Sequence, residues 1–335
     1  MKHANVAIFI PHVGCPNTCV FCNQRSISGS QHQKDPEEIR ETLAFALDNL
    51  GDRAKMSEIA FFGGSFTAID RKYMISLLET ANEFIGNESF AGIRISTRPD
   101  SIDDEILCLL KRYNVTAIEL GVQSMNDKTL IKNKRNHSST HVINSSKLIK
   151  KYGISLGHQM MVGMYGDSED DVFETADRLI KLKPDTVRIY PAVVIKNTEL
   201  EQLYLSGEYS PISLDRAVSI CSKLLKKFNN AGVNVIRLGL HAGEGLEKNI
   251  VAGPYHPAFC ELCESELYFK IGLKAIFESR IDSQNVFLYV DLKNISKMIG
   301  QNKSNIEKFK EIGYNVKVIG KENLGDYIVI AKKAV

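Results

Sequence analysis

Three cysteines near the start of the chain carry the clearest chemical signal in the sequence. Cys15, Cys19 and Cys22 form a Cys-x3-Cys-x2-Cys run directly after an apolar stretch (VAIFI) that predicts a strand, so one loop carries all three thiols. Thiolates are favoured ligands of zinc and of iron–sulfur clusters. A closed zinc site needs a fourth ligand, and the pair Cys260 and Cys263 is far away in the sequence. We therefore interpret the run as three ligands of a four-iron cluster with one open iron, with zinc as the alternative.

The composition is that of a globular protein. The chain has 335 residues, of which 44% are hydrophobic, and its net charge of +2 is too small to indicate nucleic-acid binding by charge alone. Its seven cysteines are an odd number, and the N-terminus lacks a secretion signal, which argues against a disulfide scaffold. Cys108 and Cys221 lie at apolar helix positions, so we expect them in the core. No apolar run approaches the ~20 residues that span a bilayer. We expect a cytoplasmic protein without a membrane partner.

Alternating strand and helix patterns fill most of the chain. Short apolar runs begin near Val6, Ile59, Ile93, Ile118, Leu156, Val187 and Val235. Amphipathic helix patterns lie between them; Asp35-Pro36-Glu37-Glu38 and Ser168 followed by Asp171 are typical helix starts. This order predicts an α/β fold with a parallel sheet, and a full or partial (β/α) TIM-type barrel fits the number of units.

The last part of the chain predicts a separate small α+β cap. We expect a barrel over 1–240 and a C-terminal extension over 241–335. Residues 284–335 resemble a KH-type ββ/αα unit, which clamps nucleic acid in a GXXG loop. Here the loop is Gly300-Gln301-Asn302-Lys303 and lacks the second glycine. We therefore favour a structural cap over an RNA-binding module.

Further polar motifs follow the predicted strands, where barrel enzymes place their chemistry. Phe62-Gly63-Gly64-Ser65-Phe66-Thr67 follows the second strand, and paired glycines allow close approach of the backbone to a ligand. Ser96-Thr97-Arg98-Pro99 follows the third strand and Gly121-Val122-Gln123 the fourth. An apolar wall could come from Phe62, Phe66, Met160, Met161 and Val162, although ordinary core packing is an equal alternative.

Together these motifs resemble the radical S-adenosylmethionine (SAM) superfamily. The resemblance implies a [4Fe–4S] cluster on Cys15, Cys19 and Cys22, with SAM on the open iron. It implies SAM contacts from Phe21, Gly63, Gly64, Ser65, Thr67, Ser96, Arg98, Gln123, Arg135, Gln159 and Val162. By similarity to oxygen-independent coproporphyrinogen oxidases, Gln123 and Arg135 would contact the ribose and carboxylate of SAM. Gln159 stands where that branch usually has aspartate, and an amide can still bond a diol.

The chain also resembles short relatives of the Elongator catalytic subunit over nearly its whole length. The segments IPHVGCPNTCVFCNQRSISG, FFGGSFTAID and GPYHPAF carry this likeness. The acetyltransferase domain of true Elongator subunits is expected to be absent, since the chain ends at Val335. The family name therefore does not by itself transfer the function.

The resemblance implies a 5′-deoxyadenosyl radical that abstracts hydrogen, with an electron donor such as flavodoxin or ferredoxin. Polar groups near later strand ends are candidate substrate contacts: Glu119, His158, Arg188, Tyr190, Arg237, His241, Tyr255 and His256. Arg188 and Arg237 can bind a phosphate or carboxylate, and ion pairing with acids of the barrel is the alternative.

Three functions remain open at this stage. The preferred one is a lyase acting on a nucleoside or nucleotide, specifically the release of queuine from queuosine 5′-phosphate. The second is a tRNA-modifying enzyme that uses the KH-like unit, with nucleic acid as its partner. The third is a non-catalytic iron–sulfur regulator.

Overall fold

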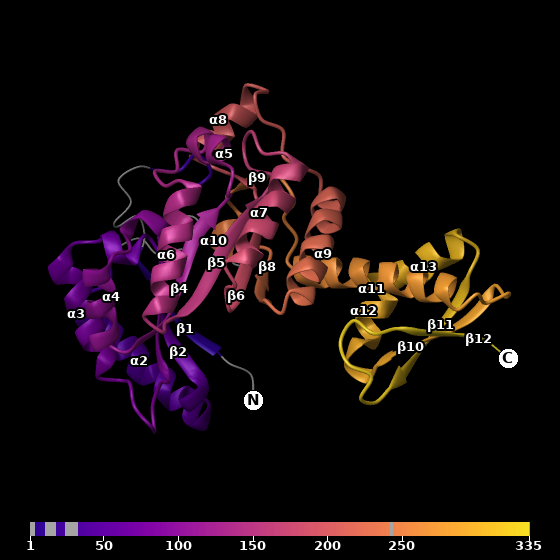
Figure 1. The fold of residues 1–335 in the computed structure, drawn as a ribbon, viewed down its shortest axis with the longest axis horizontal. Coiled ribbons are helices and arrows are strands. Elements are labelled where there is room, and N and C mark those ends of the chain that lie inside the picture. The colour runs from indigo at the N-terminus through magenta and orange to yellow at the C-terminus, as the bar shows by residue number, and fades with distance from the viewer. Residues whose placement is uncertain (1–3, 11–17, 24–32, 242–243, 335) are drawn as a thin grey trace.

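The computed structural model describes residues 4–10, 18–23, 33–241 and 244–334. Seven parallel strands form one curved sheet in chain order, apart from the skipped β7 (Figure 1). The strands are β1 (Ala4–Ile10), β2 (Ser57–Gly63), β3 (Gly92–Thr97), β4 (Val115–Gln123), β5 (Ser155–Val162), β6 (Thr186–Pro191) and β8 (Asn234–Leu238). Each begins at or near one of the seven predicted apolar runs.

Helices cover the outer face of this sheet. They are α2 (Pro36–Leu50), α3 (Arg71–Asn82), α4 (Asp104–Arg112), α6 (Ser139–Lys151), α7 (Glu169–Lys181) and α9 (Leu214–Asn230). The short helix α5 (Asp127–Lys132) lies at the end of the sheet, next to the described part of the cysteine loop. Within the described residues β1 and β8 are the sheet edges and do not pair with each other. The predicted α/β barrel is therefore confirmed in its partial form, an open half-barrel.

The predicted helix starts form as the local sequence requires. The Asp35 carboxylate accepts from the Glu38 amide at 2.9 Å, and the Glu38 carboxylate accepts from the Asp35 amide at 2.9 Å. Ser168 and Asp171 form the same reciprocal cap at the start of α7. Both caps satisfy amide groups that the first helical turn leaves unpaired.

Side chains alternate between the two faces of the sheet. Ile118 and Leu120 on β4 are fully buried in the core beneath the helices, whereas Glu119 between them faces inward. On β5, Met160 and Val162 lie in the same core as Phe66. Of the predicted apolar wall, Phe66, Met160 and Val162 are thus ordinary core residues. Phe62 instead faces the inner side, where its ring lies 5.1 Å from the Arg188 guanidinium.

Two segments outside the main sheet pair with each other. One contains β7 (Val194–Ile195) and α8 (Glu199–Leu205), the other contains α10 (Glu244–Glu247) and β9 (Ile250–Ala252), and β7 pairs antiparallel with β9. No helix in the described part of the chain is long and apolar enough to cross a membrane.

The long helix α11 (Phe259–Glu278) leads into the C-terminal unit. That unit contains β10 (Asn285–Asp291), α12 (Ile295–Ile299), α13 (Ser304–Glu311), β11 (Asn315–Lys321) and β12 (Ile330–Lys333). The central strand β10 pairs parallel with β11 and antiparallel with β12, a strand that the sequence pattern missed. In the 300–303 loop, Asn302 and Lys303 have φ of +52° and +64°, so non-glycine residues hold left-handed conformations there.

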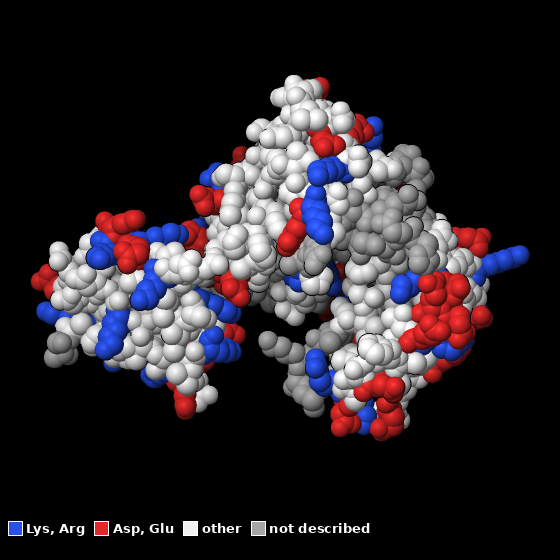
Figure 2. Space-filling view, turned by 180° about the vertical axis from the view of Figure 1, so that it is seen from behind, with Lys and Arg blue, Asp and Glu red and all other residues white. Residues whose placement is uncertain are grey.

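The hydrophobic cores divide within α11. Cys263 and Leu267 belong to the half-barrel core, whereas Tyr268 and Ile276 belong to the core of the C-terminal unit. This division falls later than residue 240, where the sequence interpretation placed the domain boundary. Figure 2 shows the two lobes joined above a wide hollow, with acidic and basic side chains interspersed on the visible face.

Candidate active site

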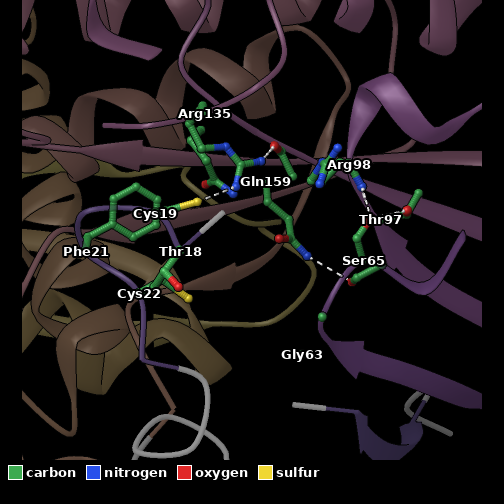
Figure 3. Close-up of a pocket in the computed structure, with 14 residues that line it drawn as sticks. Thr18, Cys19, Phe21, Cys22, Gly63, Ser65, Thr97, Arg98, Arg135 and Gln159 are labelled. Atoms are coloured by element: carbon green, nitrogen blue, oxygen red, sulfur yellow. Dashed lines mark hydrogen bonds between the residues drawn. The ribbon is translucent and has the colours of Figure 1, made fainter. Parts of the chain in front are cut away.

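A cavity of about 110 Å³ lies where the cysteine loop meets the ends of β2 to β5 (Figure 3). Nine of the eleven predicted SAM contacts line it: Phe21, Gly63, Gly64, Ser65, Ser96, Arg98, Gln123, Arg135 and Gln159. Cys19 and Cys22 line it as well, and their sulfur atoms lie on the cavity side of the loop. Cys15 lies outside the described residues.

The cysteine loop is anchored at Val20, between the two described cysteines. The Val20 amide donates to the Asn133 carbonyl at 3.3 Å, and its carbonyl accepts from the Leu200 amide at 2.8 Å. Its side chain is buried against Val194 and Tyr209. The loop is therefore fixed by contacts on both sides, which keeps Cys19 and Cys22 at the cavity.

Arg135 connects the cysteine loop to β4. Its Nη1 donates to the sulfur of Cys19 at 3.2 Å, and its Nη2 donates to the Gly121 carbonyl at 2.5 Å. A Cβ at Gly121 would lie 3.4 Å from Nη2 of Arg135 and 3.2 Å from Nε2 of Gln123. The glycine thus leaves room for both side chains at the cavity wall.

The glycine pair after β2 is required by geometry. Gly63 has φ of +109°, and a Cβ there would lie 3.0 Å from the Ile10 carbonyl oxygen. That oxygen accepts from the Gly64 amide at 2.7 Å. Only glycine combines this backbone conformation with so close an approach.

Hydroxyl groups support the wall next to the glycines. Thr97 Oγ1 lies 2.8 Å from Ser65 Oγ and 2.6 Å from Thr67 Oγ1, and Thr67 also donates to the Ser101 carbonyl at 2.6 Å. Thr67 does not line the cavity. Its side chain contacts Thr97, which in turn contacts Ser65, so it stabilises the wall without facing the ligand. Thr97 lines the cavity although sequence reasoning did not select it; its place in the Ser96-Thr97-Arg98 run was the available signal.

The Arg98 guanidinium is bound to a neighbouring carboxylate. It donates to both oxygens of Asp100, at 2.9 Å and 2.5 Å. Burial acts to raise the pKa of Asp100, but the hydrogen bonds and charge of Arg98 outweigh it and lower that pKa. The Arg98 amide also donates to Ser65 Oγ at 3.1 Å. Arg98 therefore fixes the shape of the wall through both its side chain and its backbone.

Two buried polar atoms at the cavity have no hydrogen-bond partner within the described part of the chain. They are Oε1 of Gln123 and Nε of Arg135. Gln123 also has φ of +66°, which is uncommon for a residue with a side chain. Buried polar groups are normally paired, so these atoms indicate a polar ligand that completes them.

A chain of charges crosses the inner face of the sheet beside the cavity. Glu119 on β4 is 1% exposed and accepts from Arg188 on β6 at 2.6 Å and 2.8 Å. Arg94 on β3 lies 3.3 Å from Glu119 and 2.6 Å from Glu58 on β2. Arg188 and Glu119 therefore form an ion pair with each other, which was the alternative to a substrate contact for Arg188. Sequence reasoning missed Arg94 and Glu58, whose signal was a charge within each apolar strand.

The remaining inward-facing candidates gather beside Arg188. Arg237 pairs in register with Arg188, and it donates to the Leu240 carbonyl and contacts His241 Nδ1, each at 3.0 Å. Burial and then the charges of Arg237 and Arg188 lower the pKa of His241. Burial is also the main cause of the raised pKa of Tyr190, which Arg188 and Arg237 partly offset.

The structure corrects the assignment of His158. His158 is 1% exposed and lies on the helix side of the sheet, where Nε2 is 2.9 Å from Ser146 Oγ. Burial lowers its pKa to about 3, so the ring is a neutral core residue that cannot reach a substrate. Val162, on the same side, is likewise buried in the core and does not line the cavity. The error arose because alternate strand residues point to opposite faces.

Two further candidates, Tyr255 and His256, make local contacts just before α11. Tyr255 donates to Glu247 at 2.7 Å, and His256 Nδ1 accepts from the Ala258 amide at 3.1 Å near the start of α11. Neither residue lines the cysteine-lined cavity.

The other cysteines do not form a second metal cluster in the described residues. Cys263 is buried beside Cys221, whereas Cys260 and Cys108 are exposed. The prediction of a buried Cys108 is therefore wrong; its sulfur lies 3.6 Å from the Tyr152 hydroxyl.

Comparison with protein families agrees with this site. The model of the Radical SAM superfamily matches residues 9–179, and that of the Radical_SAM C-terminal domain matches residues 184–268. The chain therefore belongs to the radical SAM superfamily and is an enzyme that uses a [4Fe–4S] cluster and SAM.

Individual proteins similar to this chain include relatives from two archaea. An uncharacterised protein of Methanocaldococcus jannaschii is 31% identical over 225 residues, 64% of this chain and 69% of that protein. The tRNA uridine(34) acetyltransferase of the same organism is 28% identical over 65% of this chain, which spans only 48% of that enzyme. The archaeal Elp3 of Methanocaldococcus infernus has the same fold, with a TM-score of 0.65 at 22% identity over 83% of this chain and 68% of that one.

The residues present fit both cofactors. Cys19 and Cys22 offer sulfur donors at the cavity, and the unpartnered atoms of Gln123 and Arg135 offer an acceptor and a donor. No set of three metal-binding side chains appears among the described residues, which do not include Cys15.

Proposed function

We propose that this enzyme abstracts hydrogen from a nucleoside unit that carries a phosphate group. The observation that supports this is the adjacency of two regions on the inner face of the sheet. One is the cysteine-lined cavity, and the other is the group formed by Arg188, Tyr190, Arg237 and His241. Glu119 connects them, since it accepts from Gln159 at the cavity wall and from Arg188. When bound, the reduced cluster and SAM supply a 5′-deoxyadenosyl radical, which removes hydrogen from an unactivated C–H bond. The protein supplies orientation and excludes competing reactions.

On the cofactor side, we assign the three cysteines to the cluster and the polar cavity wall to SAM. Cys15, Cys19 and Cys22 would hold the cluster. Gly63 and Gly64 would approach the amino group of SAM with their backbone, and Arg135 would interact with its carboxylate. Oε1 of Gln123 and Oε1 of Gln159 would accept hydrogen bonds from ribose hydroxyls.

On the substrate side, charge on the inner face favours an anion. Arg94, Arg188 and Arg237 oppose Glu58 and Glu119, which leaves one positive charge in excess among these five residues. Within the described ranges, Arg237 is the arginine of this group for which no carboxylate contact is found, and it lies next to His241. A phosphate bound by Arg237 would give this guanidinium an anionic partner. We take release of queuine from queuosine 5′-phosphate as the specific reaction, which breaks the bond between ribose and base after hydrogen abstraction from the ribose.

The deciding experiment is anaerobic reconstitution of the cluster followed by turnover with SAM, a reductant and single candidate nucleotides. The proposal predicts that 5′-deoxyadenosine forms in step with queuine when queuosine 5′-phosphate is supplied. Cys19→Ala should abolish both products, whereas Cys108→Ala, a cysteine far from the cavity, should leave both unchanged. Formation of 5′-deoxyadenosine without queuine would reject this substrate and leave the radical chemistry intact. Retained turnover in Cys19→Ala would reject the assignment of the cluster.

A second candidate is the same chemistry on a nucleoside within tRNA. Two relatives point this way, the tRNA uridine(34) acetyltransferases of Methanocaldococcus jannaschii and Methanocaldococcus infernus. Incubation with tRNA in place of the nucleotide tests it, with nuclease digestion and mass spectrometry as the readout. In either case we propose a flavodoxin or ferredoxin as electron donor and a cytoplasmic location, where exposed thiols such as Cys108 and Cys260 stay reduced.

A further inference from the structure

The outward face of the C-terminal sheet carries two aromatic rings flanked by lysines. Phe287 and Tyr289 lie two residues apart on β10, so both side chains point to the same face. Val286, Leu288 and Val290 point to the other face and are fully buried in the core of the unit. Phe287 and Tyr289 themselves remain partly exposed and belong to neither core.

The neighbouring strands place lysines directly over these rings. Lys317 on β11 and Lys332 on β12 both pair in register with Phe287. The Nζ atom of Lys317 lies 5.9 Å from the centre of the Phe287 ring, and that of Lys332 lies 5.6 Å from the centre of the Tyr289 ring. Both lysines are exposed, and no carboxylate contact is found for either of them among the described residues.

This face is open because the helices described for the unit pack on its other side. Tyr268 and Ile276 of α11, Met298 of α12 and Phe309 of α13 fill one core together with the inward residues of β10. Figure 1 shows these helices on one side of the sheet. Ile319 and Ile330, which flank Tyr289 in register, extend the outward face and are also only partly exposed.

We propose that this aromatic and lysine-bearing sheet face binds single-stranded RNA. Aromatic rings on an open surface stack on unpaired bases, and lysines beside them neutralise the phosphates. The contact between a lysine and an aromatic ring is weak at an exposed site. When a base stacks on the ring, the lysine can therefore leave the ring and bind a phosphate. Bases in a duplex are already stacked on each other, so the rings select a single strand. Residues 291–335 contain nine Lys against five Asp and Glu, and three of these lysines form ion pairs with acids, so the positive charge at this face comes from Lys317 and Lys332.

The proposal differs from the alternative in which the Gly300-Gln301-Asn302-Lys303 loop of a KH-like unit clamps nucleic acid. That loop connects α12 to α13, the helices on the covered side of the sheet. It goes beyond the proposed reaction, because binding at this face does not depend on which nucleoside the half-barrel converts.

Fluorescence anisotropy of a labelled 12-nucleotide single-stranded RNA of mixed sequence, titrated with the full chain, tests the proposal. We expect the double variant Phe287→Leu/Tyr289→Leu to bind about tenfold or more weakly than the parent, since it keeps apolar cover but removes the stacking. Lys317→Gln/Lys332→Gln should reduce the dependence of log affinity on log salt by about 0.7 for each phosphate that the lysines no longer neutralise. Phe277→Leu, an exposed aromatic on α11, and Lys310→Gln on α13 serve as matched controls and should bind as the parent does.

Three results would overturn the proposal: absence of binding by the parent, equally weakened binding in the sheet and control variants, or equal affinity for a duplex of the same length. The assay needs neither cluster nor SAM, so its failure is separate from failure of the proposed reaction. Circular dichroism of each variant establishes that the unit remains folded.

Discussion

Gln159 donates to Glu119, with its Nε2 atom 3.0 Å from a carboxylate oxygen. An ionised carboxylate only accepts hydrogen bonds, so the amide nitrogen of Gln159 must face Glu119. The same Nε2 lies 3.1 Å from Ser96 Oγ, which occupies its second proton. Oε1 is left pointing towards the cavity (Figure 3). Glu119 thereby orients the Gln159 amide so that its oxygen faces the cavity and can accept a hydrogen bond, as a carboxylate oxygen of aspartate would.

The orientation of Gln159 predicts the effect of adding charge there. Gln159→Glu places a second carboxylate against Glu119, and like charges in a buried site raise the pKa of one of them. A carboxyl with a raised folded-state pKa stabilises the protein at low pH and destabilises it as the pH rises. We therefore expect Gln159→Glu to unfold more easily than the parent at pH 8, with the difference shrinking towards pH 5. Urea unfolding at both values measures this, and a pH-independent difference would contradict it.

The ion pair between Arg188 and Glu119 predicts a large cost when one partner is removed. Arg188→Met leaves the buried Glu119 with the 3.3 Å ion pair to Arg94 as its remaining charged contact, beside the hydrogen bond from Gln159. Removing one partner from a buried pair destabilises by about 3–5 kcal/mol. The double variant Arg188→Met/Glu119→Gln removes both charges and should recover much of this stability. Denaturant unfolding of the two single variants and the double variant forms the cycle, and strict additivity would contradict the coupling.

Two buried histidines predict sensitivity to acid. His137 lies between α5 and α6 and is buried, with its Nε2 atom 3.0 Å from the Val122 carbonyl oxygen. Burial is the main cause that lowers the pKa of both His137 and His158 to about 3. The unfolded chain takes up protons at the ordinary pKa of about 6.5, while the folded chain resists protonation until about 3. Stability is therefore lost progressively as the pH falls through this window. Thermal unfolding from pH 7 to pH 4 should show a shallower decline for His158→Gln than for the parent, and parallel curves would refute the assignment.

The backbone at Gly63 predicts a decrease in both stability and SAM affinity on substitution. Alanine there must adopt φ of +109° and place Cβ 3.0 Å from the Ile10 carbonyl oxygen. We expect Gly63→Ala to lower the melting temperature and weaken SAM binding by about tenfold or more, as strain of ~1–3 kcal/mol displaces the wall. Gly86→Ala is the control, since no atom lies within 4 Å of a Cβ at that position. Equilibrium dialysis of SAM and a thermal melt measure both effects.

The sequence predicted the elements better than the orientation of their side chains. The caps at Asp35 and Ser168 depend on residues close in sequence, so their formation was foreseeable. Most of the cavity wall was foreseeable too, because its residues lie in short motifs at strand ends. The errors came from long-range geometry. His158 next to Gln159 points to the opposite face, and the choice of Arg188 between substrate and Glu119 depends on strands about 70 residues apart.

The shared helix α11 has a mechanical consequence. Its first half is part of the half-barrel core and its second half fills the core of the C-terminal unit, with no linker between Leu267 and Tyr268. Because α11 is one continuous helix packed into both cores, a rotation of the C-terminal unit would also displace β8, the strand that carries Arg237 and contacts α11. Swivelling of the lobes would require α11 to bend or one of its ends to come loose.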